Sequence, residues 1–295
     1  DSKKMVQTIQ SECQTQALSL LAKGKYKEAA ALATNVDLNN ATDYNAVAHG
    51  SYSLLCTKFK FTKIDLPAGV TSIDSKEFLN CRSLTSITIP SSVTSIGESA
   101  FEGCTSLTSI TIPSSVKSIG FSAFKDCSSL TSMTIPFVGE TVNSVWNNLF
   151  GYIFGGSLVS DNRNSVPTSL KTVVITGGTR IGTHAFDGCS SLTSITIPSS
   201  VTEIGGAAFE DCSSLTSITI PSHVTKFAAF AFSGCSSLKN VTISSGVTEI
   251  GASAFEGCTS LTNITIPSSV TAIGDDAFNG CSSLKNVTIS SGVTE

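Results

Sequence analysis

Cysteines recur along most of this chain at a fixed interval of 23 residues. The interval holds over two runs, which comprise Cys81, Cys104 and Cys127 and then Cys189, Cys212, Cys235, Cys258 and Cys281. A Phe precedes each of these cysteines by three residues and a Leu follows it by three, as Phe101 and Leu107 do around Cys104. Self-similarity at a fixed period of about 20–50 residues is the sequence signature of a solenoid or related array. We therefore expect one extended stack of similar coils.

Each repeat unit has the pattern of a single coil. The recurring segment Ser-Ile-Thr-Ile alternates apolar and polar residues, which is typical of a half-buried strand, so Ile87 and Ile89 should face inward and Thr88 should face solvent. Pro90 should end this strand because it has no N–H to donate, and Gly97 should permit the turn that closes the coil. Because one coil cannot bury its apolar side alone, about ten units over residues 58–295 must stack, with parallel strands about 4.8 Å apart.

Composition excludes several classes of protein. Charged residues make up 14% of the chain, and the net charge of −4 argues against a nucleic-acid partner, which requires concentrated Lys and Arg. No apolar run reaches the roughly 20 residues that a membrane-spanning helix needs. The sequence begins at Asp1 without a signal peptide, for which we expect a processed or trimmed N-terminus to be the explanation.

The repeat is interrupted over residues 136–169. This insertion contains four aromatic candidates for a binding site, Trp146, Phe150, Tyr152 and Phe154. Insertions in repeat proteins often build the binding face, and aromatic residues are enriched at binding hot spots. The alternative is that the aromatic side chains fold back and pack on the solenoid. Phe121 is a further candidate contact, because it replaces the Glu98 of the preceding unit.

Residues 1–57 differ from the repeats and have helical periodicity. A solenoid exposes its apolar end unless something covers it, so we expect this segment to be an α-helical N-terminal cap.

The remaining reactive residues do not form a motif with a chemical function. The ladder cysteines should be inert and buried, because parallel Cβ vectors disfavour disulfides and a single row cannot surround zinc. A disulfide between Cys13 and Cys56, which lie outside the ladder, is an alternative that the sequence does not decide. His49, His184 and His223 share no motif with a nucleophile, and the recurring carboxylates, such as Glu210 and Asp211, are interpreted as a solvated edge, with weak calcium binding as the alternative. We expect no enzyme activity, no cofactor and no metal site.

The solvent side of the predicted strands is rich in hydroxyl groups. One row of outward positions comprises Thr88, Thr111, Thr134, Thr196 and Thr219. Such a face can hydrogen-bond a sugar chain or an extended peptide, although it lacks the aromatic and Arg anchors of a tight interface. Four sequons, at Asn40, Asn240, Asn263 and Asn286, would be glycosylation acceptors only in a eukaryotic secretory host.

The unit A-F-x-x-C-x-S-L-T-S-I-T-I-P resembles the BspA-like, Treponema-type leucine-rich repeat of surface proteins, and the match covers residues 58–295. The resemblance implies an α/β repeat solenoid, a right-handed leucine-rich-repeat array with a parallel β-sheet face, on a secreted or cell-surface protein. It also implies adhesion, with a host protein, matrix component or glycan as the partner. The alternative function is a structural spacer, or a subunit that self-associates through its C-terminal edge.

Overall fold

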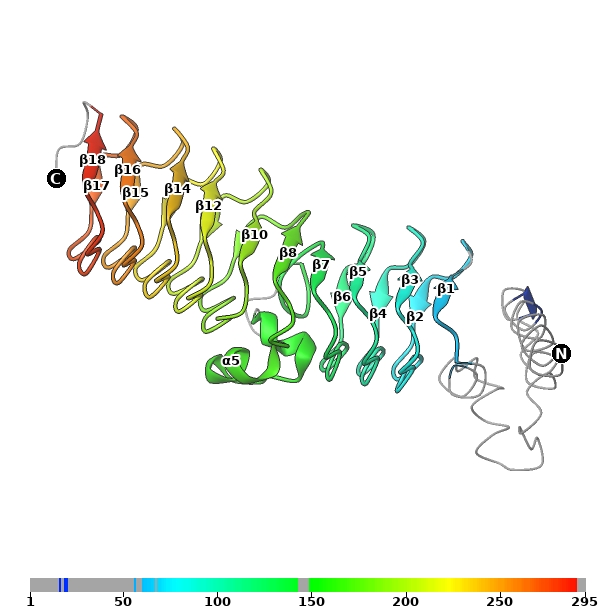
Figure 1. The fold of residues 1–295 in the computed structure, drawn as a ribbon. Helices are drawn as coiled ribbons and strands as arrows, with labels where there is room; N and C mark the ends of the chain where they lie inside the picture. The colour runs from blue at the N-terminus through cyan, green and yellow to red at the C-terminus, as the bar shows by residue number, and fades with distance from the viewer. Residues whose placement is uncertain are drawn as a thin grey trace, which may run out of the picture.

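The structure is a computed structural model that describes residues 16, 19–20, 56, 60–66, 68–142 and 149–290. Parallel-strand coils are stacked side by side along one axis, about ten in number over the described ranges (Figure 1). The predicted helical cap over residues 1–57 lies outside the described residues apart from four isolated positions. Of these, Leu20 and Cys56 pack against the core of the solenoid.

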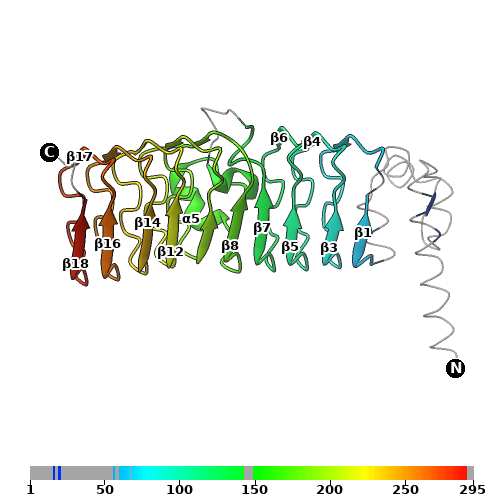
Figure 2. The ribbon, with the colours of Figure 1, turned by 90° about the horizontal axis from the view of Figure 1, so that it is seen from above.

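One strand from each coil contributes to a long parallel row, which we call the strand face (Figure 2). Neighbouring strands pair in register, so that Ser109 lies opposite Ser132 and Ile110 opposite Met133. Inward residues such as Ile110 are buried, which confirms the period-2 pattern. The row consists of β1 (Lys63–Asp65), β3 (Ser86–Thr88), β5 (Ser109–Thr111), β7 (Ser132–Ile135), β8 (Thr172–Ile175), β10 (Ser194–Thr196), β12 (Ser217–Ile220), β14 (Asn240–Ile243), β16 (Asn263–Ile266) and β18 (Asn286–Ile289).

A second row is made of two-residue strands, each with one side chain in the core. Its Ile residues are the final apolar residue of the V-T-x-I-G segment, as Ile96 and Ile119 show. The row consists of β2 (Ser72–Ile73), β4 (Ser95–Ile96), β6 (Ser118–Ile119), β9 (Arg180–Ile181), β11 (Glu203–Ile204), β13 (Lys226–Phe227), β15 (Glu249–Ile250) and β17 (Ala272–Ile273).

The third side of each coil is a turn segment built around the repeated Phe. These rings stack from coil to coil, with the centroids of Phe78 and Phe101 5.1 Å apart and their planes inclined by 4°. Backbone bonds run alongside: Phe101 N–H donates to the carbonyl of Ala123 at 2.7 Å, and Gly103 N–H donates to that of Lys125 at 2.8 Å. The turn segments are therefore tied to one another by hydrogen bonds although they contain no regular strand.

Two residues in each turn segment adopt the left-handed backbone conformation, two positions before and two after the Phe. In the coil of Phe209 these are Ala207 and Asp211, with φ of 52° and 53°. Most side chains pay a steric cost there, which explains why the second position is Gly in Gly103, Gly188, Gly234, Gly257 and Gly280. The first position carries non-Gly residues throughout: Lys76, Ser99, Ser122, His184, Ala207, Phe230, Ser253 and Asp276.

Gly97 is required for a reason other than the one we expected. Its φ is not in the left-handed region, but a Cβ at this position would stand 2.4 Å from the backbone nitrogen of Ser75. Gly120 has the same relation to Glu98, at 2.4 Å from its backbone nitrogen. The repeated Gly thus permits close approach between coils, and turn formation falls to the left-handed residues that follow it.

The ladder cysteines are free thiols with a structural role beyond apolar packing. Each of six thiols donates to the carbonyl oxygen of a Phe in the preceding coil, 26 residues earlier, at 3.1–3.3 Å. Cys212, for example, donates to Phe186. Burial raises the pKa of these thiols, to about 12 for Cys127 and Cys258. The donors are Cys104, Cys127, Cys212, Cys235, Cys258 and Cys281.

The insertion leaves the strand face unbroken, because β7 pairs directly with β8 and Ser132 lies opposite Thr172. It forms three short helical elements, η1 (Phe150–Phe154), η2 (Val159–Asp161) and α5 (Asn162–Ser165), which lie against the turn segments (Figure 1). The described ranges contain no longer helix than these. The fold is therefore a parallel-strand solenoid, and the expected α/β class is not confirmed. None of the described helices has the length and apolar character to cross a membrane.

Candidate functional site

The outward threonines of the strand face lie in one continuous line, as the sequence predicted. We call this line the threonine row. Thr88, Thr111, Thr196 and Thr219 are exposed and Thr134 is half-buried. The parallel register places Thr111 beside Thr134 and Thr219 beside Thr242. The row consists of Thr88, Thr111, Thr134, Thr196, Thr219, Thr242, Thr265 and Thr288, with Val174 as its one apolar member.

Hydroxyls of the threonine row differ from other hydroxyls of the repeat in how they are bonded. Thr108 and Thr131 each donate to a backbone carbonyl of the preceding coil, at 3.4 and 3.0 Å, and Thr202 does the same on the second row at 3.1 Å. In the threonine row Thr88 donates to the carboxylate of Asp65 at 2.6 Å. Among the described residues, the hydroxyls of the row from Thr111 through Thr288 make no hydrogen bond. These hydroxyls are therefore free to bond a ligand.

The strand face carries little charge next to the threonine row. Its neighbouring line is serine in the first coils and asparagine in the last, where Asn286 Nδ2 donates to Asn263 Oδ1 at 2.8 Å. Asn240, Asn263 and Asn286 are exposed. Apart from Lys63 and Asp65 of β1, these two lines are thus polar and uncharged, which suits hydrogen bonding to a long ligand more than burial of one large anchor.

Two of the four aromatic candidates of the insertion belong to the core. Phe150 is 0% exposed and Phe154 is 2% exposed. The Phe150 ring lies 4.8 Å from Phe186 and the Phe154 ring lies 6.4 Å from Phe124, measured between centroids. The pair therefore bridges the two halves of the Phe stack. Phe150 and Phe154 thus follow the alternative in which the aromatic side chains pack on the solenoid, and neither ring is exposed to a binding partner. Trp146 lies outside the described residues.

Tyr152 and Phe121 pack against each other at the edge of the insertion. Both are half-buried, and their ring centroids are 5.4 Å apart in an edge-to-face arrangement. The carbonyl of Tyr152 accepts from Ser122 N–H at 3.1 Å and so replaces the missing coil. Burial, with the nearby Glu140 carboxylate, raises the pKa of Tyr152. Phe121 is therefore half covered by Tyr152, and only the rim of this pair faces solvent.

Asn162, which sequence reasoning missed, holds the insertion on the solenoid. Its side chain is 0% exposed, its Oδ1 accepts from Gly151 N–H at 2.6 Å, and its Nδ2 donates to the carbonyl of His184 at 3.0 Å. Buried polar groups are retained when they are satisfied in this way. No sequence signal pointed to Asn162, because an Asn in a non-repeated segment resembles any surface loop residue.

Replacement of Asn162 by Ala is expected to lower the free energy of unfolding by about 2–3 kcal/mol, because the buried Gly151 N–H loses its acceptor and the His184 carbonyl keeps only the Asp187 N–H as a donor. Asn164→Ala on the same short helix is the matched control, since that side chain is exposed. Urea unfolding and limited proteolysis of the insertion would measure both effects. Equal stability of the two variants would contradict the anchoring role.

Apart from the last strand, β18, large apolar side chains are exposed at two places in the described residues. Leu158 and Val159 of the insertion are 64% and 38% exposed. Phe230 is 44% exposed and occupies a left-handed position, with φ of 60°, that neighbouring coils fill with Ala207 and Ser253. The deviation of Phe230 from the small residues of its row was the available signal.

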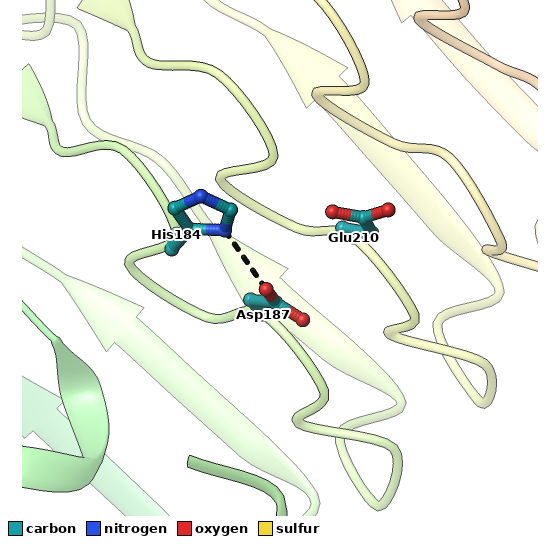
Figure 3. A group of neighbouring side chains, drawn as sticks. All are labelled: His184, Asp187 and Glu210. Carbon is teal, nitrogen blue, oxygen red and sulfur yellow. Dashed lines mark hydrogen bonds and ion pairs between the residues drawn. The ribbon is translucent and has the colours of Figure 1, made fainter. Parts of the chain in front are cut away.

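One group of metal-ligating side chains comes together beside the insertion. His184 Nδ1 lies 2.8 Å from Asp187 Oδ2, and Glu210 of the next coil stands beside them (Figure 3). One ligand atom from each of the three residues lies within 4.8 Å of the others. Burial raises the pKa of Glu210, and the charges of Asp187 and Asp211 raise it further. We had expected a solvated carboxylate edge here. The repeat register already places Asp187 beside Glu210, and sequence reasoning did not connect His184 with them because it searched for contiguous motifs.

Stacked parallel-strand coils of 23 residues, with an inward Leu, Ile and Phe in each coil, define a leucine-rich-repeat solenoid. The family model described as "BspA type Leucine rich repeat region" matches residues 50–155 and 179–295 in six copies. The chain belongs to this family, as the resemblance of its repeat unit implied. No curated protein sequence matches the chain.

Several solved structures are similar to the chain. A leucine rich cell surface protein of Faecalibacterium prausnitzii is 38% identical, with 78% of this chain and 60% of that chain covered and a TM-score of 0.42. The Leucine Rich Repeat protein of T. pallidum is 28% identical, with 68% and 78% covered and a TM-score of 0.37. A leucine-rich repeat protein of Bacteroides ovatus is also 28% identical, with 76% and 65% covered and a TM-score of 0.39. The chain spans about three-fifths of the length of the first of these proteins.

Proposed function

We propose that this protein is a non-catalytic binding module at the cell surface or in secreted form, and that it mediates adhesion through the strand face. The observation that carries the proposal is the threonine row, whose hydroxyls from Thr111 onward have no side-chain partner among the described residues. The name of the F. prausnitzii relative, a cell surface protein, supports the location. Extended binding surfaces are the usual means by which solenoids act.

The chemistry of the row favours a ligand with repeating polar groups. Hydroxyls both donate and accept hydrogen bonds, and from Thr88 to Thr288 they recur in every coil except that of Val174. A glycan chain or an extended peptide of a host or matrix protein presents such groups at regular intervals. A compact protein partner would need aromatic or Arg anchors, which the described part of the threonine row does not contain.

Binding to an array of glycans and matrix proteins tests this proposal. The informative variant is Thr196→Val with Thr219→Val, because Val174 already occupies the same row and shows that the side chain is accepted there. Thr225→Val, an exposed threonine on the second row, is the matched control. We expect the double variant to bind at least about tenfold more weakly, as the loss of one or two good hydrogen bonds implies. Undiminished binding by the double variant would contradict the strand-face site.

Self-assembly is a second candidate function. Val287 and Ile289 of β18 are 45% and 55% exposed, whereas Ile264 and Ile266 hold the same positions in β16 and are buried. Sedimentation velocity over a range of concentrations distinguishes the two functions. Concentration-dependent polymers would support assembly, and a monomer that binds the array would support adhesion.

A further inference from the structure

We propose that His184, Asp187 and Glu210 form a binding site for a divalent transition-metal ion, for which Zn²⁺ is the best match. The site lies on the turn segments of two successive coils (Figure 3). The threonine row lies on the strand face instead. The proposal therefore does not depend on the adhesive function.

The donor set selects the class of ion. One imidazole nitrogen and two carboxylate oxygens are ligands that Zn²⁺ accepts, whereas Ca²⁺ and Mg²⁺ prefer oxygen alone. Two carboxylates also balance the two charges of the ion. His184 is 38% exposed at its side chain, which leaves the solvent side of the group open for water as a further ligand.

The spacing of the three groups requires little movement to close around an ion. Their ligand atoms lie within 4.8 Å of one another, so an ion at their centre is within roughly 0.8 Å of bonding distance to each, given zinc bonds of about 2.0–2.2 Å. The three groups thus reach an ion by small side-chain rotations. His184 is also held from behind, because Asn162 Nδ2 donates to its backbone carbonyl at 3.0 Å.

Charge in the neighbouring coils gives an independent reason to expect a cation here. The residue after the repeated Phe forms a row across the coils. Elsewhere in this row a carboxylate meets a compensating group: Lys125 lies 3.5 Å from Glu102, and Asn279 donates to Glu256 at 3.4 Å. At Asp187 and Glu210 two carboxylates are adjacent instead, and like charges in register are destabilising. Arg163 is close enough for its charge to lower the pKa of Glu210, but its guanidinium is paired with Asp211 at 2.8 Å.

Titration of the full chain with ZnCl₂ by calorimetry, with thiols kept reduced, tests the site. Each variant introduces a residue that another coil carries at the equivalent position. For His184→Ser these residues are Ser99 and Ser122, and for Asp187→Ser it is Ser233. We expect one Zn²⁺ per chain, a rise in the thermal midpoint with Zn²⁺, and a more than about tenfold loss of affinity in each variant.

Two controls separate this site from general zinc binding. His223→Ser removes an exposed histidine from a position that is Ser200 in another coil, and it should leave the affinity unchanged. Glu210→Gln removes one ligand charge with little change of shape, and it should also weaken binding. This variant tests the site even if a serine variant folds poorly. The proposal is overturned if the parent chain shows neither heat nor a thermal shift with Zn²⁺, or if folded variants bind as tightly as the parent.

Discussion

The free energy of unfolding is expected to fall steeply as the pH rises above about 8.5, because unfolded cysteines ionise there and the buried ones do not. Burial raises the pKa of all eight ladder thiols, and the rise is largest for the seven from Cys81 to Cys258. For Cys127 and Cys258 the pKa is about 12. Between pH 8.5 and pH 12 the unfolded chain binds fewer protons than the native one. The contribution of the thiols to the free energy of unfolding is therefore fully present below about pH 8.5 and is lost as the pH rises toward 12. Each of these seven thiols contributes about 1.4 kcal/mol per pH unit, and together they contribute about 10 kcal/mol per pH unit.

Urea unfolding at successive pH values, under reducing conditions, measures this slope. Lysines and tyrosines also titrate in alkali, so the variant Cys212→Ser isolates the thiol contribution. It should reduce the slope by about 1.4 kcal/mol per pH unit relative to the parent, whatever its effect on stability at neutral pH. An unchanged slope would show that the native Cys212 thiol ionises as easily as an unfolded one.

Phe209→Ala is expected to lower the free energy of unfolding by about 3–5 kcal/mol, the usual cost of emptying a buried aromatic site. The Phe209 ring is 0% exposed and lies between Phe186 and Phe232, at centroid distances of 5.4 and 5.1 Å. Both stacking contacts are lost together with the buried area. Because each coil contacts only its neighbours, a cavity here weakens the interfaces on both sides.

The control is Phe121→Ala, which removes a half-buried ring that packs against Tyr152 alone among its aromatic neighbours in the described chain. It should cost about 1–2 kcal/mol, since less area leaves the core. Chemical denaturation followed by circular dichroism compares the two variants. A similar loss in both would mean that the coils collapse around the Phe209 cavity and that the stack is not tightly packed.

The repeat itself could be predicted in detail, because a contact between residues 23 positions apart is repeated in every coil. Register, the inward Ile and Leu, the Phe stack and the threonine row all follow from that periodicity. The same reasoning misassigned Gly97, whose role depends on the distance to Ser75 in the preceding coil. It also treated Cys212 as a small apolar residue, since nothing in the sequence shows that the carbonyl of Phe186 needs a donor.

The sequence alone determined the class of fold and the arrangement of its rows, because a fixed period dictates which residues stack. Only the tertiary structure decided what the non-repeated residues do. It placed Phe150 in the core, made Asn162 the anchor of the insertion, and brought His184 beside Asp187 and Glu210. The contacts of Phe150 and Asn162 join the insertion to coils to which no period relates it, so they depend on how the insertion folds. Asp187 and Glu210 are one period apart, and there the structure added the position of the His184 side chain.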